Sequence, residues 1–278
     1  TNTYEISEEF SDIKVNTDTA DILFAASSDN TCRVVCYEEE NVKHSASVQD
    51  GALTISVVDD RAWYEHIGFS FHSPTVTIYL PKTEYESLVI EESTGDITLP
   101  KDFTFGRMDL SVSTGHVDCL ASSLGLMRIK TSTGDIRLQN LSAGELDLTV
   151  STGHVSVQSV VCEGNVEVSV STGKTELKDI SCKSIHSEGS TGNITLKNVV
   201  TEGTIAIERS TGDVRFEGCD ADELEISTDT GDVTGSLLSS KVFIAHSDTG
   251  RIDVPETTSG GKCKITTDTG DIKLSVKK

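Results

Sequence analysis

Residues 88–99 read LVIEESTGDITL, and the Ser-Thr-Gly at their centre decides the fold because it returns along most of the chain. A Ser/Asp-Thr-Gly triplet occurs ten times, each time 19 or 20 residues after the previous one. Its glycines are Gly95, Gly115, Gly134, Gly153, Gly173, Gly192, Gly212, Gly231, Gly250 and Gly270. A fixed period of this length is typical of stacked repeats, none of which can bury its apolar face alone.

Apolar and polar residues alternate around each glycine. The position two after the glycine is apolar except at Thr175, and the position four after it is apolar except at Gly235. These two columns include Ile97, Val117, Ile136, Val155, Ile194, Val214, Val233, Ile252, Ile272, Leu99, Leu138, Leu177, Leu196, Phe216, Val254 and Leu274. A third column, seven after the glycine, holds Leu141, Val160, Ile180, Val199, Cys219 and Leu238. Alternation with a period of two predicts β-strands with one buried face.

Each repeat therefore consists of short strands joined by a tight turn at Thr-Gly. At about 3.3 Å per strand residue, a repeat traces one closed coil, and stacking places equivalent strands about 4.8 Å apart in parallel register. The sequence predicts an all-β protein, a parallel β-helix or β-solenoid of about ten coils of 19 or 20 residues.

The recurring triplet is best explained as a turn. Glycine adopts positive φ without steric cost, and the adjacent Ser, Asp or Asn can hydrogen-bond to the turn backbone. Asp-Thr-Gly at 229–231, 248–250 and 268–270 matches the aspartic-protease motif as a string. That chemistry needs two carboxylates that share a proton in one cleft, whereas these are regular members of the repeat. We expect no catalytic residues.

Composition limits the classes of partner. The net charge is -22, which repels nucleic-acid phosphates and disfavours DNA or RNA as a partner. Aromatic residues are only 5% of the chain, too few for an aromatic platform along the repeats. No apolar stretch is long enough for a membrane span and there is no signal peptide, so membrane association is expected only through a segment absent from this chain, which opens at Thr1.

The seven cysteines do not form the pattern of a disulfide framework. Cys32 and Cys36 are about 13 Å apart along a strand and cannot bridge. Cys162 and Cys182 should be stacked neighbours, for which two free buried thiols are favoured over a bridge. No zinc-ligand spacing is present, and we expect no metal and no cofactor.

Residues 1–85 lack the triplet but keep short β-like runs, so we expect a β-rich cap on a continuous solenoid of residues 86–278. The aromatic residues Trp63, Tyr64, Phe69 and Phe71 cluster in this cap and are candidate ligand contacts, with a lid packed on the first coil as the favoured alternative. The last coil runs from Asp271 into Lys277 and Lys278 without a cap, which leaves end-to-end homodimerisation open there.

One acidic cluster is a candidate for carbohydrate or calcium chemistry. Aspartates line the late corners at coil spacing: Asp213, Asp229, Asp232, Asp248, Asp268 and Asp271. Polysaccharide-active β-helices need such clustered carboxylates. The competing interpretation is that aspartate next to glycine is a turn residue. Ice binding, suggested by the aligned threonines, is disfavoured because the neighbouring outward column is mixed and charged.

An IYLP strand followed by LVIEESTGDITL and many (V/I)xxSTGDIxL units resembles the bacterial putative-adhesin domain family, over essentially the whole chain. The resemblance implies a right-handed β-helix at the bacterial cell envelope or extracellular surface, with some relatives tied to envelope stress. It implies a non-enzymatic binding protein or structural scaffold, with a protein or glycan partner. Carbohydrate binding or cleavage and envelope-stress regulation are the alternatives, and the cysteines leave a cytoplasmic location open.

Overall fold

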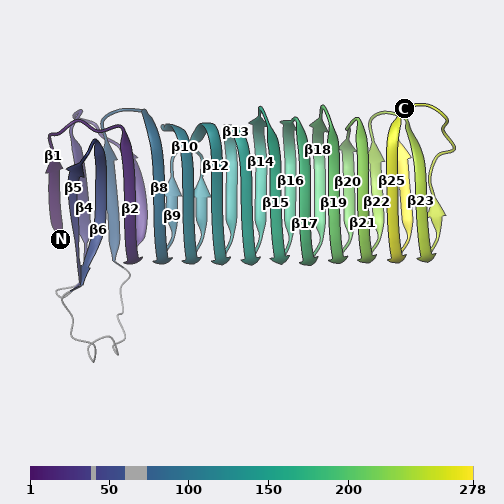
Figure 1. Ribbon diagram of the computed structural model, residues 1–278, viewed down its shortest axis with the longest axis horizontal. Coiled ribbons are helices and arrows are strands. Elements are labelled where there is room, and N and C mark those ends of the chain that lie inside the picture. Colours follow the sequence, from purple (N-terminus) through teal and green to yellow (C-terminus); the bar gives the residue numbers. More distant parts are fainter. Residues whose placement is uncertain (39–41, 60–73, 278) are drawn as a thin grey trace, which may run out of the picture. The chain divides into compact units, whose positions relative to one another are not determined.

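The computed structural model describes residues 1–38, 42–59 and 74–277, and all regular structure among them is β-strand (Figure 1). The chain forms two compact units, Thr1–Thr133 and Gly134–Lys278. In each unit, strands one repeat apart pair in parallel register, as Thr114 pairs with Thr133 and Thr152 with Thr172. The predicted all-β solenoid of stacked parallel coils is therefore confirmed.

The second unit consists entirely of coils with Thr-Gly corners. Its strands are β13 (Ile136–Thr152), β14 (Val155–Cys162), β15 (Asn165–Thr172), β16 (Thr175–Cys182), β17 (Ser184–Thr191), β18 (Ile194–Thr201), β19 (Thr204–Thr211), β20 (Val214–Cys219), β21 (Glu223–Thr230), β22 (Val233–Leu237), β23 (Lys241–Thr249), β24 (Ile252–Asp253), β25 (Gly261–Thr269) and β26 (Ile272–Val276). The predicted apolar columns form the core, where Ile136, Val155 and Leu196 have no exposed surface.

The last three coils of this unit do not stack in sequence order. Strand β25 lies between β21 and β23, and β26 lies between β22 and β24 (Figure 1). Backbone hydrogen bonds fix this order, because Gly231 donates to Thr269 at 2.9 Å and Gly270 donates to Thr249 at 3.0 Å. The expectation of an open end at the last coil is wrong, since its strands are paired on both sides.

The outermost coil of this end is instead β23 and β24. Its core positions are poorly covered, so Ile252, which pairs with the buried Ile272 and was predicted to be buried, is 45% exposed. Ile244 is 52% exposed because it faces outward, opposite Lys264. Leu238 was also predicted to be buried and is 45% exposed. The bulge at Gly218, with φ 65°, has no equivalent in the next coil, so Leu237 pairs with Cys219 and takes the core position.

Arg209 explains the polar Thr175 in an apolar column. The Arg209 guanidinium is buried and donates from Nη2 to Ser187 Oγ at 2.8 Å and to Thr175 Oγ1 at 3.5 Å, and from Nη1 to the Glu208 carbonyl at 2.9 Å. A Cβ at Gly189 would lie 2.9 Å from Nη1. The small and polar residues of the neighbouring coil therefore accommodate one buried cation, whose hydrogen bonds offset part of its desolvation.

The corners depend on close contact between backbones. Gly173 has φ 146°, and a Cβ there would lie 1.6 Å from the Gly153 carbonyl oxygen. Gly173 also donates its N–H to the Thr191 carbonyl at 2.8 Å. The residue after each glycine often adds a side-chain bond, as where His154 N–H donates to Asp135 Oδ1 at 2.9 Å. Glycine is needed here for space as well as for its dihedral freedom.

The first unit begins with antiparallel strands and continues with coils. Its strands are β1 (Asn2–Ile6), β2 (Asp12–Thr19), β3 (Asp21–Ala26), β4 (Cys32–Tyr37), β5 (Val42–Gln49), β6 (Ala52–Asp59), β7 (Thr75–Leu80), β8 (Glu84–Thr94), β9 (Ile97–Leu99), β10 (Thr104–Thr114), β11 (Val117–Cys119) and β12 (Ser122–Thr133). Antiparallel pairs β1–β4, β4–β7 and β5–β6 form one end of this unit. Antiparallel strands that cover the end of a parallel stack limit pairing with other chains.

A coil without the triplet precedes the glycine series. Strand β2 pairs in parallel with β8, and β3 pairs with β9, so Thr19-Ala20 lies at the corner beside Thr94-Gly95. Asp96 N–H donates to Asp21 Oδ1 at 3.0 Å, as at the later corners. The expectation that residues 1–85 form a separate cap stays a prediction, and part of them already has coil geometry.

Glu92 is a buried carboxyl group next to this corner. It accepts hydrogen bonds from the Thr17 hydroxyl and from the backbone N–H groups of Ala20 at 3.3 Å and Thr94 at 3.1 Å. Burial raises the pKa of Glu92 from 4.5 to about 7, an effect that the backbone hydrogen bonds only partly offset. The folded state therefore binds this proton more tightly than the unfolded state.

We expect a pH dependence of stability from Glu92. Because its pKa is raised on folding, its contribution is fully present below pH 4.5 and is lost as the pH rises through about 7. Thermal melts should show the midpoint falling across this range, and Glu92→Gln should remove that part of the slope. The exposed neighbour Glu91, changed to Gln, is the control and should keep the slope. Equal slopes for wild type and Glu92→Gln would contradict the assignment.

Candidate ligand-binding site

The aromatic residues predicted as ligand contacts, Trp63, Tyr64, Phe69 and Phe71, lie outside the described residues. Their role as ligand contacts or as a lid stays a prediction.

The predicted acidic cluster forms two columns on one corner of the second unit. Because the last coils stack out of sequence order, one column runs Asp213, Asp232 and Asp271, and the other runs Asp229, Asp268 and Asp248. All six side chains are exposed.

Three of these aspartates have a structural role at the corner. Asp213 Oδ1 accepts the N–H of Asp232 at 3.0 Å, and Asp232 Oδ1 accepts the N–H of Asp271 at 2.7 Å. Asp271 Oδ1 in turn accepts the N–H of Arg251 at 2.8 Å. These bonds explain the preference for Asp after glycine without a bound ion or substrate.

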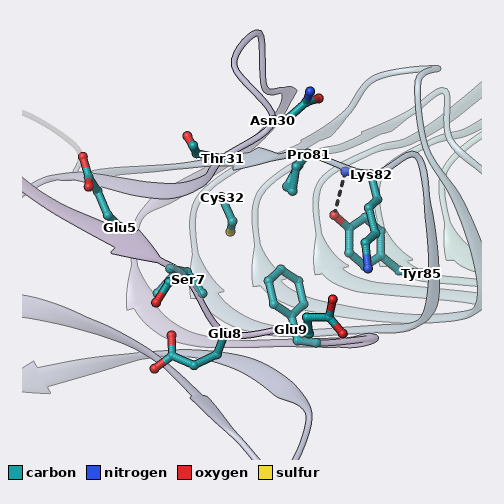
Figure 2. Close-up of a pocket in the computed structure, with 12 residues that line it drawn as sticks. Glu5, Ser7, Glu8, Glu9, Asn30, Thr31, Cys32, Pro81, Lys82 and Tyr85 are labelled. Atoms are coloured by element: carbon teal, nitrogen blue, oxygen red, sulfur yellow. Dashed lines mark hydrogen bonds between the residues drawn. The ribbon is translucent and has the colours of Figure 1, made fainter.

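A pocket of about 360 Å³ lies in the first unit, where the chain leaves β1, enters β4 and leaves β7 (Figure 2). The pocket is lined by several short, partly exposed segments of the chain. Its side chains therefore do not belong to one sequence motif. The lining residues are Glu5, Ile6, Ser7, Glu8, Glu9, Phe10, Asn30, Thr31, Cys32, Pro81, Lys82 and Tyr85.

Aromatic rings form the base of the pocket. The Tyr85 ring stacks on Phe10 with a centroid distance of 5.6 Å, and on Phe105 at 6.1 Å. Tyr85 Oη accepts the backbone N–H of Lys82 at 3.3 Å, as Figure 2 shows. Stacked rings present apolar surface at fixed positions, which suits an apolar ligand group.

The pocket offers no ionised nucleophile from its base. Burial raises the pKa of Tyr85 to about 12 and that of Cys32 to about 11, so both groups are neutral near pH 7. A reactive cysteine needs a lowered pKa. The pocket chemistry therefore fits binding better than covalent catalysis.

The rim of the pocket is mainly acidic. Glu5, Glu8 and Glu9 carry negative charge there, against the single cation Lys82 among the lining residues (Figure 2). Clefts lined by one sign of charge attract ligands of the opposite sign and repel their own. This rim disfavours an anionic ligand.

The turn at Asn30 is held in shape on one side of the pocket. Asn30 has φ 59°, a conformation that Asn tolerates better than most residues. Asp29 accepts the Ser27 and Thr31 hydroxyl hydrogens, both at 2.7 Å, and lies 3.2 Å from Arg33 Nη2. The turn is thus pre-organised by polar bonds below its exposed tip.

Sequence reasoning missed this pocket because its residues come from separate turns with no shared spacing. The available signal was Phe10, an aromatic residue within the polar turn SEEFSD, followed much later by Tyr85 in KTEYES.

Among the described residues, a search for membrane-spanning helices finds none of sufficient length and hydropathy.

Solved structures similar to this chain include proteins from Parabacteroides species. A structure described as a putative lipid binding protein from Parabacteroides distasonis has a TM-score of 0.55 at 13% identity, over 99% of this chain and 96% of the other. A putative adhesin from the same species has a TM-score of 0.53 at 14% identity, over 98% and 96%. A putative adhesin from Parabacteroides merdae has a TM-score of 0.52 at 15% identity, over 99% and 95%.

At these identities the likeness shows the fold. No curated protein matches the sequence significantly. The model of the Toastrack DUF4097 family matches residues 10–169 and again 162–278, which together span nearly all of the chain. The chain belongs to the Toastrack DUF4097 family.

Proposed function

We propose that this chain is a non-enzymatic binding protein of the bacterial envelope or surface, and that its first unit takes an apolar group of a ligand into the pocket at Tyr85. The observation that carries the proposal is the pocket itself, which combines an aromatic base with neutral Cys32 and Tyr85. The repeated coils then serve as a scaffold, and a protein or glycan partner at the envelope could present the bound group.

Several features support a ligand that has an apolar group and a neutral or cationic head group. A volume of about 360 Å³ falls in the range of small-molecule sites. The acidic rim of Glu5, Glu8 and Glu9 disfavours carboxylate or phosphate groups. The description of one structural relative as a lipid-binding protein agrees with an apolar ligand, and the descriptions of others as adhesins agree with a surface location.

The alternative of a carbohydrate-active enzyme is less well supported. Three of its six candidate carboxylates, Asp213, Asp232 and Asp271, already accept backbone N–H groups that hold the corner together. Envelope-stress regulation has no specific observation in its favour.

A binding experiment with matched probes tests the proposed function. We expect a fluorescently labelled fatty amine to bind more tightly than the fatty acid of equal chain length and label. Ser7, exposed at the pocket, should be changed to Trp to fill it, and affinity for the amine should fall by about 10-fold or more, or about 1.4 kcal/mol. Fluorescence anisotropy titrations give the affinities.

Ser113→Trp is the matched control, because Ser113 is exposed on β10 and does not line the pocket. It should leave the affinity unchanged, whereas Glu8→Gln with Glu9→Gln should reduce the preference for the amine. If neither probe binds, or if both Trp variants bind like wild type, the pocket is not the ligand site.

A further inference from the structure

Three side chains that commonly bind metals meet at the antiparallel end of the first unit. Cys36 lies in β4, Glu38 follows that strand, and His44 lies in β5. One candidate ligand atom from each residue lies within 4.8 Å of the other two. All three side chains are buried, those of His44 and Glu38 being only 1% and 3% exposed and Cys36 fully covered.

A set of hydrogen bonds orients this cluster. Glu38 Oε2 lies 3.0 Å from His44 Nδ1 and accepts the His44 backbone N–H at 2.6 Å. The Asn2 side-chain amide donates to Glu38 Oε1, and the Tyr4 hydroxyl donates to the His44 carbonyl oxygen. Strand β1 therefore holds both Glu38 and β5 in place, as outer residues do around metal ligands.

One polar atom of the cluster is unsatisfied. His44 Nε2 is buried and has no hydrogen-bond partner within residues 1–38, 42–59 and 74–277. A buried polar group without a partner loses its hydrogen bonds to water and gains none in return, so such an atom calls for an explanation. Since Nδ1 is already next to Glu38, a rotated ring or an added ligand would resolve the mismatch.

The donor set selects a class of ion. A thiolate and an imidazole suit zinc and the late transition metals, whereas magnesium and calcium prefer oxygen ligands. Tetrahedral zinc, with bonds of about 2.0 to 2.3 Å, places its ligand atoms about 3.3 to 3.7 Å apart. Atoms already within 4.8 Å of one another reach that spacing by small side-chain rotations.

Charge balance also favours a dication. Ionised Cys36 and Glu38 together carry two negative charges, and neutral His44 adds none, so a dication makes the buried site neutral overall. A thiol binds a metal ion as the thiolate, so metal binding must release the Cys36 proton. Affinity should therefore increase with pH.

We propose that Cys36, Glu38 and His44 bind one zinc-class dication, with a fourth position free for water or another ligand. The ion joins the end of β4 to β5, two strands that belong to different antiparallel pairs, and so closes this end of the unit. The spacing Cys-x-Glu followed by His six residues later matches no common zinc motif, which is why the sequence predicted no metal.

Metal titration of the chelator-treated full chain tests this site. We expect Zn²⁺, in competition with a chromophoric chelator, to bind at one ion per chain with Kd below about 1 μM. Co²⁺ should give a thiolate-to-metal charge-transfer band and the visible bands of tetrahedral coordination. Cys36→Ser and His44→Gln should each weaken Zn²⁺ binding by about 100-fold or more and abolish the charge-transfer band.

Cys119→Ser is the matched control, because Cys119 is also a buried free thiol of the first unit and lies outside both the cluster and the pocket at Tyr85. It should leave binding and spectrum unchanged. Circular dichroism melts without metal check that each variant folds. If Cys36→Ser does not fold, alkylation of wild-type Cys36 replaces it, measured by mass spectrometry in enough urea to expose this buried thiol, where Zn²⁺ should slow the reaction.

Several outcomes would overturn the proposal. These are no stoichiometric binding, a Co²⁺ complex without a thiolate band, equal losses in Cys119→Ser and Cys36→Ser, or no protection of Cys36 by Zn²⁺. A Co²⁺ complex with oxygen ligands only would indicate adventitious binding to exposed carboxylates. The result is independent of the fatty-amine titration, since none of the three ligands lines the pocket at Tyr85.

Discussion

Replacing Ile136 with aspartate should unfold much of the second unit. Ile136 has no exposed surface and lies in β13, where it pairs in register with Val155 of the next coil. An unpaired carboxylate buried there costs several kcal/mol, a large part of the roughly 5–15 kcal/mol that stabilises a typical domain. Neighbouring coils lose their stacking partner, so the damage should extend beyond one repeat.

Urea unfolding followed by circular dichroism measures this effect. The matched control is Gln139→Asp, in the same strand but exposed, which should shift the stability by only about 0.5 kcal/mol. An unchanged unfolding curve for Ile136→Asp, or equal losses in both variants, would show that the inward and outward faces of β13 are assigned wrongly.

Adding a single methyl group at Gly173 should be nearly as damaging. In Gly173→Ala the new Cβ would lie 1.6 Å from the Gly153 carbonyl oxygen, well inside van der Waals contact. That oxygen belongs to the backbone of the adjacent coil, so relief of the clash requires the two coils to separate at the corner. We expect a loss of more than about 3 kcal/mol, larger than strain in φ alone causes.

Gly51→Ala separates the two effects. Gly51 also has positive φ, at 77°, but a Cβ there would meet no heavy atom within 4 Å. Its substitution should cost only the conformational penalty, about 1–2 kcal/mol. Thermal and urea midpoints of each variant against wild type give the comparison. Equal losses at the two glycines would mean that φ, and not contact between coils, selects glycine at the corners.

The repeat was readable from the sequence because a physical requirement recurs at each corner. A residue such as Val155 must alternate inward, and Gly173 must avoid a Cβ, so both leave a periodic pattern. The order in which the last coils stack left no such periodic pattern in the sequence. The corners at Gly231, Gly250 and Gly270 meet the same local requirements, whichever neighbour each one has.

One local difference accompanies the change in coil order. Residues 254–260 join β24 to β25 without strand structure and include Pro255 and Gly260, the latter with φ 114°. Most earlier corners are followed by strands that continue almost directly. A longer connection lets the chain pass back over β23, but its length alone does not say where the next coil docks.

The candidate sites depend on contacts that no local pattern encodes. Phe10 and Tyr85 stack although 75 positions separate them in the sequence. Cys36, Glu38 and His44 are close in sequence, but their contact depends on β4 and β5 belonging to different antiparallel pairs. Likewise, the coil at Ala20 was missed because the corner there lacks the glycine on which the repeat was recognised.

The position of the last coil, whose strands β25 and β26 lie between earlier strands, has a consequence for folding during synthesis. Most coils of the second unit can dock on their predecessor as soon as the ribosome releases them, which keeps unpaired edges short-lived. Residues 241–253 cannot dock in this way, because β25 and β26, the partners of β23 and β24, come later in the chain. Strand β25 also lies between β23 and β21. This segment must wait as an exposed, partly apolar strand, so the interval before residues 261–276 emerge is when the nascent chain is most open to mispairing.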